Sequence, residues 1–402
     1  MQNDHYIMNE AFVTLSWIFL FVLFYSYLGY GILLYGLVLI KRLNHGKKPI
    51  GVPNHWPTVT HLIAAYNEEE IIDHKIQNSL SLQYPAGKMK IVVITDGSDD
   101  DTPQLVSKYP NVQLLHQPQR KGKIAAVHRA MEILDSNIII FSDANTLLND
   151  AAIQRIARHF ASPDVGVVAG EKRVITEAKD TASAAGESLY WKYESTLKQW
   201  DGEWYSTVGA AGELFGIRRE LYHPVPKDSI IEDFVMTLTI AMQGYRIAYE
   251  PGAYAMETAS SSVAEEMKRK VRISAGAVQA MIRLKSLLNP LKYGKLSFQY
   301  WSHRVLRWTL GPIGLLFLFF SLPLLALSTG GIYSWMAGIQ LLLYLLALLG
   351  WILEKRELRM KALFVPYYFV MMNLCVIKGW IRFANGRQSV LWERAGRKAT
   401  TT

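Results

Sequence analysis

Three carboxylates in this chain stand close behind or beside short apolar runs, where side chains are well placed to do chemistry. Asp96 and Asp143 follow the runs 91–94 and 138–141, and Asp233 stands beside Glu232 ahead of another apolar segment. Oxygen ligands such as those of Asp143 and Asn145 suit a Mg²⁺ or Mn²⁺ ion that bridges a diphosphate. A carboxylate such as Asp233 can take a proton from a hydroxyl group as a new bond forms. These residue types predict metal-assisted group transfer.

Basic residues accompany the carboxylates. Lys123 ends the segment Arg-Lys-Gly-Lys at 120–123, at the start of a predicted helix, where free backbone amides and basic side chains can hold phosphate. The segment is not a phosphate-binding P-loop, because it lacks the glycine spacing of that motif. Arg269 and Arg272 are three residues apart and share one face of a predicted helix. They are suited to offset the charge of a leaving diphosphate.

Each motif also has a purely structural interpretation. The segment from Asp143 to Asn145 fits a helix-capping turn, and Glu232 with Asp233 fits an acidic helix start. The two arginines fit a basic surface that faces a membrane. Aromatic residues that can stack on sugar rings or belong to the core are Trp191, Tyr193, Trp200, Trp204 and Tyr205. The shared order of all the motifs favours one functional site.

The elements that must position these residues alternate between strand and helix. Short β-branched runs predict strands at 59–65, 90–95, 112–116, 137–142 and 165–168, with helices at 68–82, 124–134 and 151–160 between them. This alternation predicts a doubly wound parallel sheet with helices on both faces. Ligands of such sheets bind beyond the carboxyl ends of the strands, where Asn67, Asp96 and Asp143 fall.

Later segments predict a different arrangement. We expect an amphipathic helix at 182–204, a strand at 213–217 after the glycine-rich segment 209–212, and helices at 234–242 and 263–284.

Long apolar segments flank this region. The run 11–40 is long enough to cross a bilayer, as are 305–328, 334–352 and 362–381. Lys41 and Arg42 follow the first run at once, so the positive-inside rule places the next segment in the cytoplasm. Three further crossings would then put the basic C-terminal tail outside, against the same rule. A last segment that is re-entrant or interfacial would remove the conflict.

Charge and cysteine content exclude some classes of protein. The net charge is +9, but the basic residues gather at the membrane flanks and in 268–285 without a nucleic-acid motif. Anionic lipid and an anionic substrate are therefore the expected partners, and nucleic acid is not. Cys375 is the only cysteine, which excludes a disulfide framework and a thiolate metal site.

With these motifs in order, residues 58–285 resemble the membrane-bound glycosyltransferases of family 2, and within them the bacterial polysaccharide-synthase-like enzymes. The residues that carry the resemblance are Ala64-Ala-Tyr-Asn67-Glu68, Asp96-Gly-Ser, Gly122-Lys123, Asp143-Ala-Asn145, Gly209-Ala-Ala-Gly212 and Glu232-Asp233. The resemblance implies an α/β, Rossmann-like GT-A domain in the cytoplasm, flanked by transmembrane helices.

The resemblance also implies a role for each residue. Asp96 would contact uracil, Lys123 would approach the nucleotide, and Asp143 with Asn145 would hold the metal ion and the nucleotide. Asp233 would be the catalytic base of an inverting displacement that forms a β-linkage from a UDP-α-sugar. The other residues expected to contact nucleotide or substrate are Asn67, Glu68, Glu232, Arg269 and Arg272.

Three positions depart from the family pattern. Asn145 replaces the second aspartate of the metal motif, and Thr95 replaces the first of a paired aspartate. The Gln-x-x-Arg-Trp signature of processive synthases aligns with 269–273, where Ile273 stands in place of tryptophan. Without that ring a growing sugar chain loses a stacking surface, which argues against processive polymerisation.

The resulting expectation is a multi-pass enzyme of the plasma (inner) membrane. The expected parts are a transmembrane anchor at 1–41, a linker at 42–57, the GT-A domain at 58–285, an interfacial segment at 286–304, transmembrane helices at 305–383 and a basic tail at 384–402. It would transfer a sugar from a UDP-sugar to a polysaccharide or lipid-linked acceptor in exopolysaccharide or envelope glycan synthesis, alone or with a partner membrane subunit. Transfer of a single sugar to a membrane lipid, and a catalytically silent binding subunit, are the alternatives.

Overall fold

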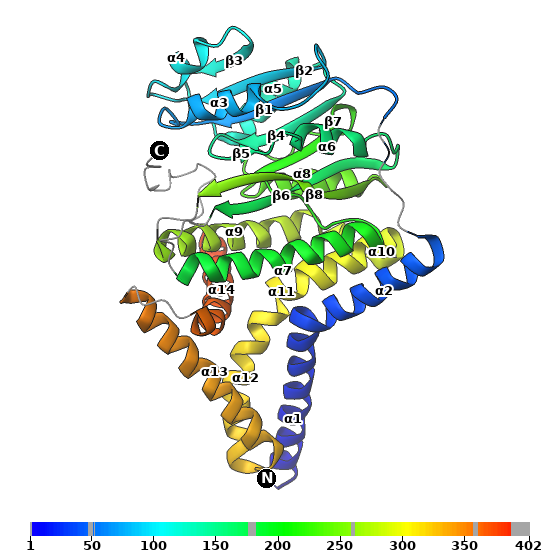
Figure 1. Ribbon diagram of the computed structural model, residues 1–402. Coiled ribbons are helices and arrows are strands. Elements are labelled where there is room, and N and C mark those ends of the chain that lie inside the picture. Colours follow the sequence, from blue (N-terminus) through cyan, green and yellow to red (C-terminus); the bar gives the residue numbers. More distant parts are fainter. Residues whose placement is uncertain are drawn as a thin grey trace.

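The computed structural model describes residues 2–46, 51, 53–175, 182–258, 262–356 and 361–386. An α/β domain forms one end of the molecule, and long apolar helices form the other (Figure 1). Parts of several expected segments lie outside the described residues: residue 1 of the anchor, 47–50 and 52 of the linker, 176–181 and 259–261 of the GT-A domain, 357–360 of the transmembrane region, and 387–402 of the basic tail.

The domain is built on one eight-stranded sheet in the order β3-β2-β1-β4-β7-β6-β8-β5. Its first half is parallel, as predicted, and consists of β1 Val59–Ala65, β2 Met89–Asp96, β3 Val112–Gln117 and β4 Ile138–Asp143. Ala64 of β1 pairs with Ile94 on one side and with Asp143 on the other. Asp96 and Asp143 therefore end neighbouring strands at the same edge of the sheet.

Helices cover both faces of this parallel half. They are α3 Ile72–Leu80, α4 Thr102–Ser107, α5 Lys123–Ile133 and α6 Ala152–His159. Adjacent side chains of β1 point to opposite faces: Leu62 packs in the core with Ile124 of α5, and Ile63 packs with Ile72 of α3. The expected helices on both faces are confirmed.

The second half of the sheet is mixed, so the predicted parallel arrangement holds for β1 to β4. Strand β7, Leu214–Arg218, runs antiparallel to β4 and to β6, Val165–Ile175. A long strand that was not predicted, β8 Arg246–Thr258, pairs in parallel with β6 and in antiparallel with β5, Leu147–Leu148. Pro251 and Gly252 resemble a turn in the sequence, but β8 continues through them. They lie where the register of the pairing between β8 and β6 shifts.

Three further helices complete the domain. They are α7 Ala182–Trp204, α8 Glu232–Ala241 and α9 Val263–Arg283. Helices α7 and α9 lie between the sheet and the apolar helices (Figure 1). Any group that passes from the sheet to the membrane helices must therefore pass α7 and α9.

Four helical segments of the described chain are long and apolar enough to span a membrane: Glu10–Asn44, Leu310–Ser328, Ile332–Lys355 and Ala362–Ala384. The first is not one straight anchor, because α1 Gln2–Phe24 and α2 Tyr30–His45 are joined by a π-helix, Tyr25–Gly29. Helix α1 points away from the domain, whereas α2 turns aside and runs beneath it against α7 (Figure 1).

The expected interfacial segment 286–304 is helical and belongs to the domain core. It contains η3 Lys285–Leu288, α10 Pro290–Tyr300 and a second π-helix, Trp301–Val305, followed by the short α11 Leu306–Trp308. Leu296 and Tyr300 are buried in the main core of the domain. The backbone breaks at Thr309, so the next long apolar helix, α12 Leu310–Ser328, begins five residues later than expected.

The last two helices differ in their surroundings. In the most apolar stretch of α13, Ile332–Lys355, 11% of the residues are buried. The corresponding share for α14, Lys361–Ala384, is 44%. Helix α14 packs on α9 and α7 of the domain as well as on α13 (Figure 1). It is therefore as much a part of the domain as of the helical bundle.

Candidate active site

A cavity of about 1050 Å³ opens at the carboxyl ends of β1, β2 and β4 and extends between α7, α8, α9 and α14. Nine of the predicted site residues line it: Glu68, Asp96, Lys123, Asp143, Asn145, Glu232, Asp233, Arg269 and Arg272. The sequence order of the motifs thus corresponds to one place in the fold. Asn67 is not among the lining residues.

Asp96 organises the loop that precedes α5. Its carboxylate accepts hydrogen bonds from the backbone amides of Lys121, at 3.0 Å, and Gly122, at 2.6 Å. Gly97, next in the chain, has φ of +70°, and a Cβ there would lie 2.6 Å from the backbone nitrogen of Arg120. Only glycine allows the two loops to approach this closely. The contact of Asp96 with a nucleobase stays a prediction.

Asn67 ties the loops after β1 and β2 together. It adopts the left-handed conformation with φ of 52°. Its side-chain amide donates to Asp99 Oδ1 at 2.5 Å, and its Oδ1 accepts from the backbone amide of Asp99 at 3.1 Å. In this structure Asn67 supports the wall of the cavity through Asp99.

Lys123 joins the end of β4 to the start of α8. Its Nζ lies 2.7 Å from Asp143 Oδ1 and 3.3 Å from Glu232 Oε1. Burial alone would lower the pKa of Lys123, but the carboxylates of Asp143 and Glu232 outweigh it and raise the pKa. The lysine therefore stays charged and holds two acidic elements in place.

Asp233 is a partly buried carboxylate that lines the cavity. Burial, and next the negative charge of Glu232, raise the pKa of Asp233 to about 7. Its Oδ1 accepts a hydrogen bond from the backbone amide of Phe234 at 2.9 Å. A Cβ added at Gly212 would lie 3.2 Å from its Oδ2. A carboxylate tuned in this way suits a general base at physiological pH.

Sequence reasoning missed an acidic and basic cluster beside these groups. Lys172 of β6 lies 2.7 Å from Glu213 and also forms an ion pair with Glu257 of β8, which in turn lies 3.5 Å from Arg269. Burial alone would raise the pKa of Glu213, but the cations of Lys172 and Arg269 outweigh it and lower the pKa. Glu213 directly follows the glycine-rich segment, which was a usable signal, whereas Glu257 ends a strand that the sequence did not reveal.

The predicted metal ligands have few protein partners for an ion. Asp143 contacts Lys123, and Asn145 donates its Nδ2 to Glu257 Oε1 at 2.9 Å, which leaves the amide oxygen as an acceptor. Within the described ranges, no three His, Cys, Asp or Glu residues are grouped to hold an ion. Mg²⁺ and Mn²⁺ often take one or two protein ligands and complete their shell with phosphate oxygens and water. The donor set fits an ion shared with a bound diphosphate.

Helices α9 and α7 supply the remaining wall. Burial lowers the pKa of Arg272, which faces the negative charges of Glu232 and Asp233. Ile273 lines the cavity where processive synthases carry tryptophan, but Trp191 of α7 lines it as well. The ammonium groups of Lys172, Lys198 and Lys270 lie 5.3 to 5.6 Å from the centre of the Trp191 ring.

Comparisons with known proteins support a common ancestry. Residues 60–225 match the sequence profile of Glycosyl transferase family 2. The poly-beta-1,6-N-acetyl-D-glucosamine synthase of Staphylococcus aureus (strain COL) is 26% identical over 253 residues, which cover 60% of this chain and 60% of that protein. The probable glycosyltransferase YdaM of Bacillus subtilis (strain 168) is 23% identical over 300 residues, covering 71% and 70%. The chain thus spans about 60% of the length of the curated synthases that it matches.

A solved structure supports the fold. Mannosyltransferase PcManGT from Pyrobaculum calidifontis, in complex with GDP-Man and Mn²⁺, superimposes with a TM-score of 0.65 and 21% identity, covering 92% of this chain and 99% of that one. The similarity includes the flanking apolar helices, because it extends over nearly the whole of both chains. Residues 60–225, which include most of the GT-A-like sheet, are thus a family 2 glycosyltransferase domain by their sequence profile, and the chain is a distant homologue of the poly-β-1,6-N-acetylglucosamine synthases.

Proposed function

We propose that this chain is a membrane-integrated, inverting glycosyltransferase that moves a sugar from a UDP-sugar to a hydroxyl group of an acceptor. The observation that carries the proposal is Asp233, a partly buried carboxylate with a pKa raised to about 7 in the same cavity as Lys123 and Asp143. A metal-bridged diphosphate and a base near neutral pH are the two parts that such a displacement requires.

The sheet end of the cavity would bind the donor. Asp143 and Asn145 would hold Mg²⁺ or Mn²⁺, which when bound would neutralise charge on the diphosphate. Arg269 and Arg272 line the same cavity from α9 and carry positive charge to the leaving group. Asp96 fixes the loop that starts α5 and so positions Lys123.

Asp233 would carry out the proton transfer. The acceptor oxygen attacks the anomeric carbon, the bond from that carbon to the diphosphate oxygen breaks, and the acceptor proton moves to Asp233. A direct displacement of this kind inverts the anomeric configuration. Glu232 keeps the pKa of Asp233 high enough for efficient proton uptake, because its negative charge disfavours the ionised form of its neighbour.

The helices support a cytoplasmic domain. Lys41 lies on α2, after α1, and Lys355 ends α13. If α1, α12 and α13 each cross the membrane once, both lysines lie on the same side as the domain. Helix α14, packed on α9, then stays on that side. This arrangement satisfies the positive-inside rule, which four full crossings would not.

The test is donor turnover by the full chain in a neutral detergent, measured as nucleotide release with Mg²⁺ or Mn²⁺. Separate reactions contain UDP-glucose, UDP-N-acetylglucosamine, UDP-glucuronate and GDP-mannose, the last because the protein of similar fold binds it. We expect one UDP-sugar to be turned over and Asp233→Asn to lower the rate by about 100- to 10,000-fold with UDP affinity retained.

The matched control is Asp228→Asn, which removes a carboxylate that is 67% exposed and paired with Arg283. It should leave turnover unchanged. Equal rates in Asp233→Asn and wild type would reject the assigned base. Failure of the wild type to bind any donor would favour the silent binding subunit.

A further inference from the structure

The cavity does not end at Asp233 but continues toward the membrane helices. Its far end is lined by α7, the two π-helices with α11, and α14, through Tyr27, Leu28, Glu194, Lys198, Arg304, Arg307, Phe369 and Met372. Among the described residues, none of α12 or α13 lines the cavity. The far end is therefore a pocket beside the membrane helices and does not continue between α12 and α13.

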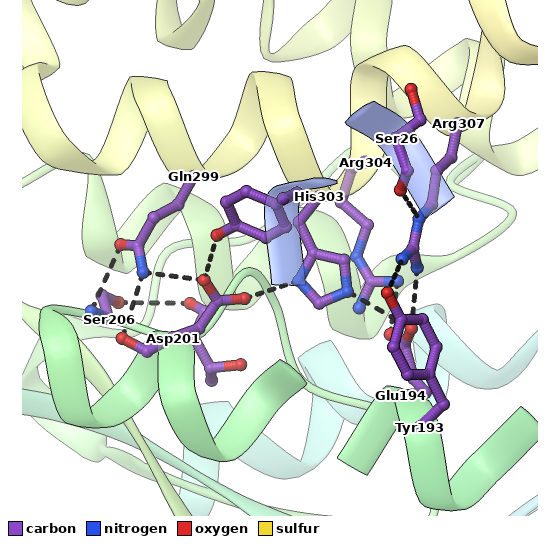
Figure 2. Close-up of polar contacts among 11 residues, drawn as sticks. Ser26, Tyr193, Glu194, Asp201, Ser206, Gln299, His303, Arg304 and Arg307 are labelled. Atoms are coloured by element: carbon purple, nitrogen blue, oxygen red, sulfur yellow. Dashed lines mark hydrogen bonds and ion pairs between the residues drawn. The ribbon is translucent and has the colours of Figure 1, made fainter. Parts of the chain in front are cut away.

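One carboxylate at this end is surrounded by cations. Glu194 lies 3.2 Å from His303 Nε2, 2.7 Å from Arg304 Nη1 and 3.3 Å from Arg307 Nη1 (Figure 2). The other ring nitrogen of His303 lies 2.5 Å from Asp201 Oδ2 (Figure 2). Both ring nitrogens of His303 thus lie within hydrogen-bonding distance of carboxylate oxygens.

Lys198 adds a cation that has no acceptor of its own. It lies one turn after Glu194 on α7, and 6% of the residue is exposed. Within the described part of the chain, its ammonium group forms no hydrogen bond or ion pair and lies 5.6 Å from the centre of the Trp191 ring. Burial lowers the pKa of Lys198, since the charged form is poorly solvated. The side chain lines the cavity.

Lys198 forms no ion pair with the carboxylates that face it within the described part of the chain. Glu194, Glu171 and Glu213 act on it through space, but Glu194 pairs with Arg304 and Arg307, Glu213 pairs with Lys172, and Glu171 accepts a hydrogen bond from Ser195. An unpaired buried cation is costly unless an anion joins it. The open cavity gives an anion access to this cluster.

The cavity has an apolar wall beside the membrane helices. Leu28 and Val365 line the cavity and are also 58% and 46% exposed. Phe369, Met372 and Val376 of α14 line it as well. A ligand that reaches the cations by this route needs an apolar part that remains along α14.

We infer that the membrane end of the cavity binds the phosphate of a lipid acceptor, whose apolar tail lies along α14 and the π-helix of residues 25–29. The inference rests on the proposed function, because it names the class of acceptor for the same cavity. Lys198 and Arg304 bind the phosphate from α7 and from the π-helix Trp301–Val305. The acceptor thus brings an anion to a buried lysine that forms no ion pair with the described residues.

The experiment measures binding to the full chain in a neutral maltoside detergent. The probes are dioctanoyl phosphatidate, the uncharged dioctanoylglycerol, and inorganic phosphate. We expect phosphatidate to bind and the other two to bind at least about 10-fold more weakly. Lys198→Met should weaken phosphatidate binding by about 10- to 100-fold, as expected for the loss of one charged hydrogen bond. Lys198→Arg should retain it.

Lys192→Met is the matched control, because Lys192 is exposed on the same helix. It should bind phosphatidate like the wild type. Binding of diacylglycerol or inorganic phosphate as tight as that of phosphatidate, or unchanged binding by Lys198→Met, would overturn the inference. UDP binding is measured in parallel: a protein that binds UDP but not phosphatidate refutes the lipid acceptor alone, whereas one that binds neither UDP nor any sugar nucleotide refutes the proposed function.

Discussion

Lys123 at the sheet end of the cavity lies among three carboxylates, whereas Glu194 at the membrane end lies among two arginines and a histidine. The acidic surroundings of Lys123 suit a substrate that arrives with a divalent cation. The basic surroundings of Glu194 suit an anion that arrives alone. One cavity thus has two ends of opposite charge, and each end selects a different kind of ligand.

The two ends also differ in what their charges support. The carboxylates near Lys123 stand at the end of β4 and at the start of α8. Glu194 and Asp201, by contrast, are buried between α7 and the segments that connect the membrane helices to the domain. We therefore expect substitutions at the sheet end to change turnover, and those at the membrane end to change stability as well.

The largest expected effect follows the loss of Asp201. Its carboxylate accepts hydrogen bonds from Tyr30 of α2 and from Gln299, and it pairs with His303. Asp201→Leu leaves these buried partners unpaired and should reduce the free energy of unfolding by about 3 to 5 kcal/mol. A lower melting temperature in detergent, with UDP affinity retained below the transition, would be the result.

Glu203→Gln is the control for that prediction. Glu203 also joins α7 to α2, through an ion pair with Arg42 at 2.6 Å, but this pair is partly exposed. Its loss should cost about 1 kcal/mol or less. If both substitutions lower the melting temperature equally, burial does not distinguish the two contacts.

Asp143→Asn should act on turnover. It removes the negative charge that Lys123 contacts at 2.7 Å and that the expected metal ion would share. We expect the transfer rate to fall by about 100- to 1000-fold, while phosphatidate binding at the membrane end remains as in the wild type. Equal loss of phosphatidate binding would mean that the two ends are not independent, and would contradict the comparison.

Substitution of Gly379 tests the close contact between α14 and α9. A Cβ at this position would lie 2.5 Å from Ser274 Cβ and 2.9 Å from the backbone nitrogen of Ala275 on α9. Gly379→Ala should therefore push α14 from α9, at a cost of about 1 to 3 kcal/mol in stability. Gly338→Ala in α13 meets no atom within 4 Å and should be neutral or stabilising.

The smallest expected effect is a shift in pH dependence. Asp233 must be ionised to act as a base, so kcat/KM should rise with pH through the pKa of about 7. Glu232→Gln removes a negative charge that raises the pKa of Asp233, so the rising limb should move to lower pH, by about one unit. If the rising part of the pH profile stays in place or moves to higher pH, Glu232 does not raise the pKa of Asp233.

The sheet end could be predicted from the sequence because strand ends mark it. Asp96 and Asp143 each follow an apolar run, and parallel strands bring such ends together. Glu257 could not be found in this way, because Pro251 and Gly252 conceal the strand that carries it. Asn67 was placed correctly at a strand end, but its side chain is used within the wall.

The membrane end could not be predicted, because its partners are far apart in sequence. Asp201 and His303 are separated by 102 positions and belong to segments that were read as an amphipathic helix and an interfacial region. Lys198 on a helix looks like a solvated residue until the packing of α7 is known. The final apolar helix, α14, has a composition that fits a membrane span and does not reveal its contact with α9.

The π-helix at residues 25–29 provides backbone acceptors to this end of the protein. The carbonyl oxygen of Ser26 accepts Arg307 Nε at 2.9 Å, and that of Tyr27 accepts the Tyr193 hydroxyl at 2.5 Å (Figure 2 shows Ser26, Tyr193 and Arg307). A widened turn leaves such carbonyls without their regular partners, and it contains one residue more than the α-helical turn it replaces. Substitution of Ser26 or Tyr27 leaves these acceptors in place, whereas deletion of one residue would restore the regular turn and remove them. The fit between the anchor and the domain is thus encoded in the length of the segment more than in its side chains.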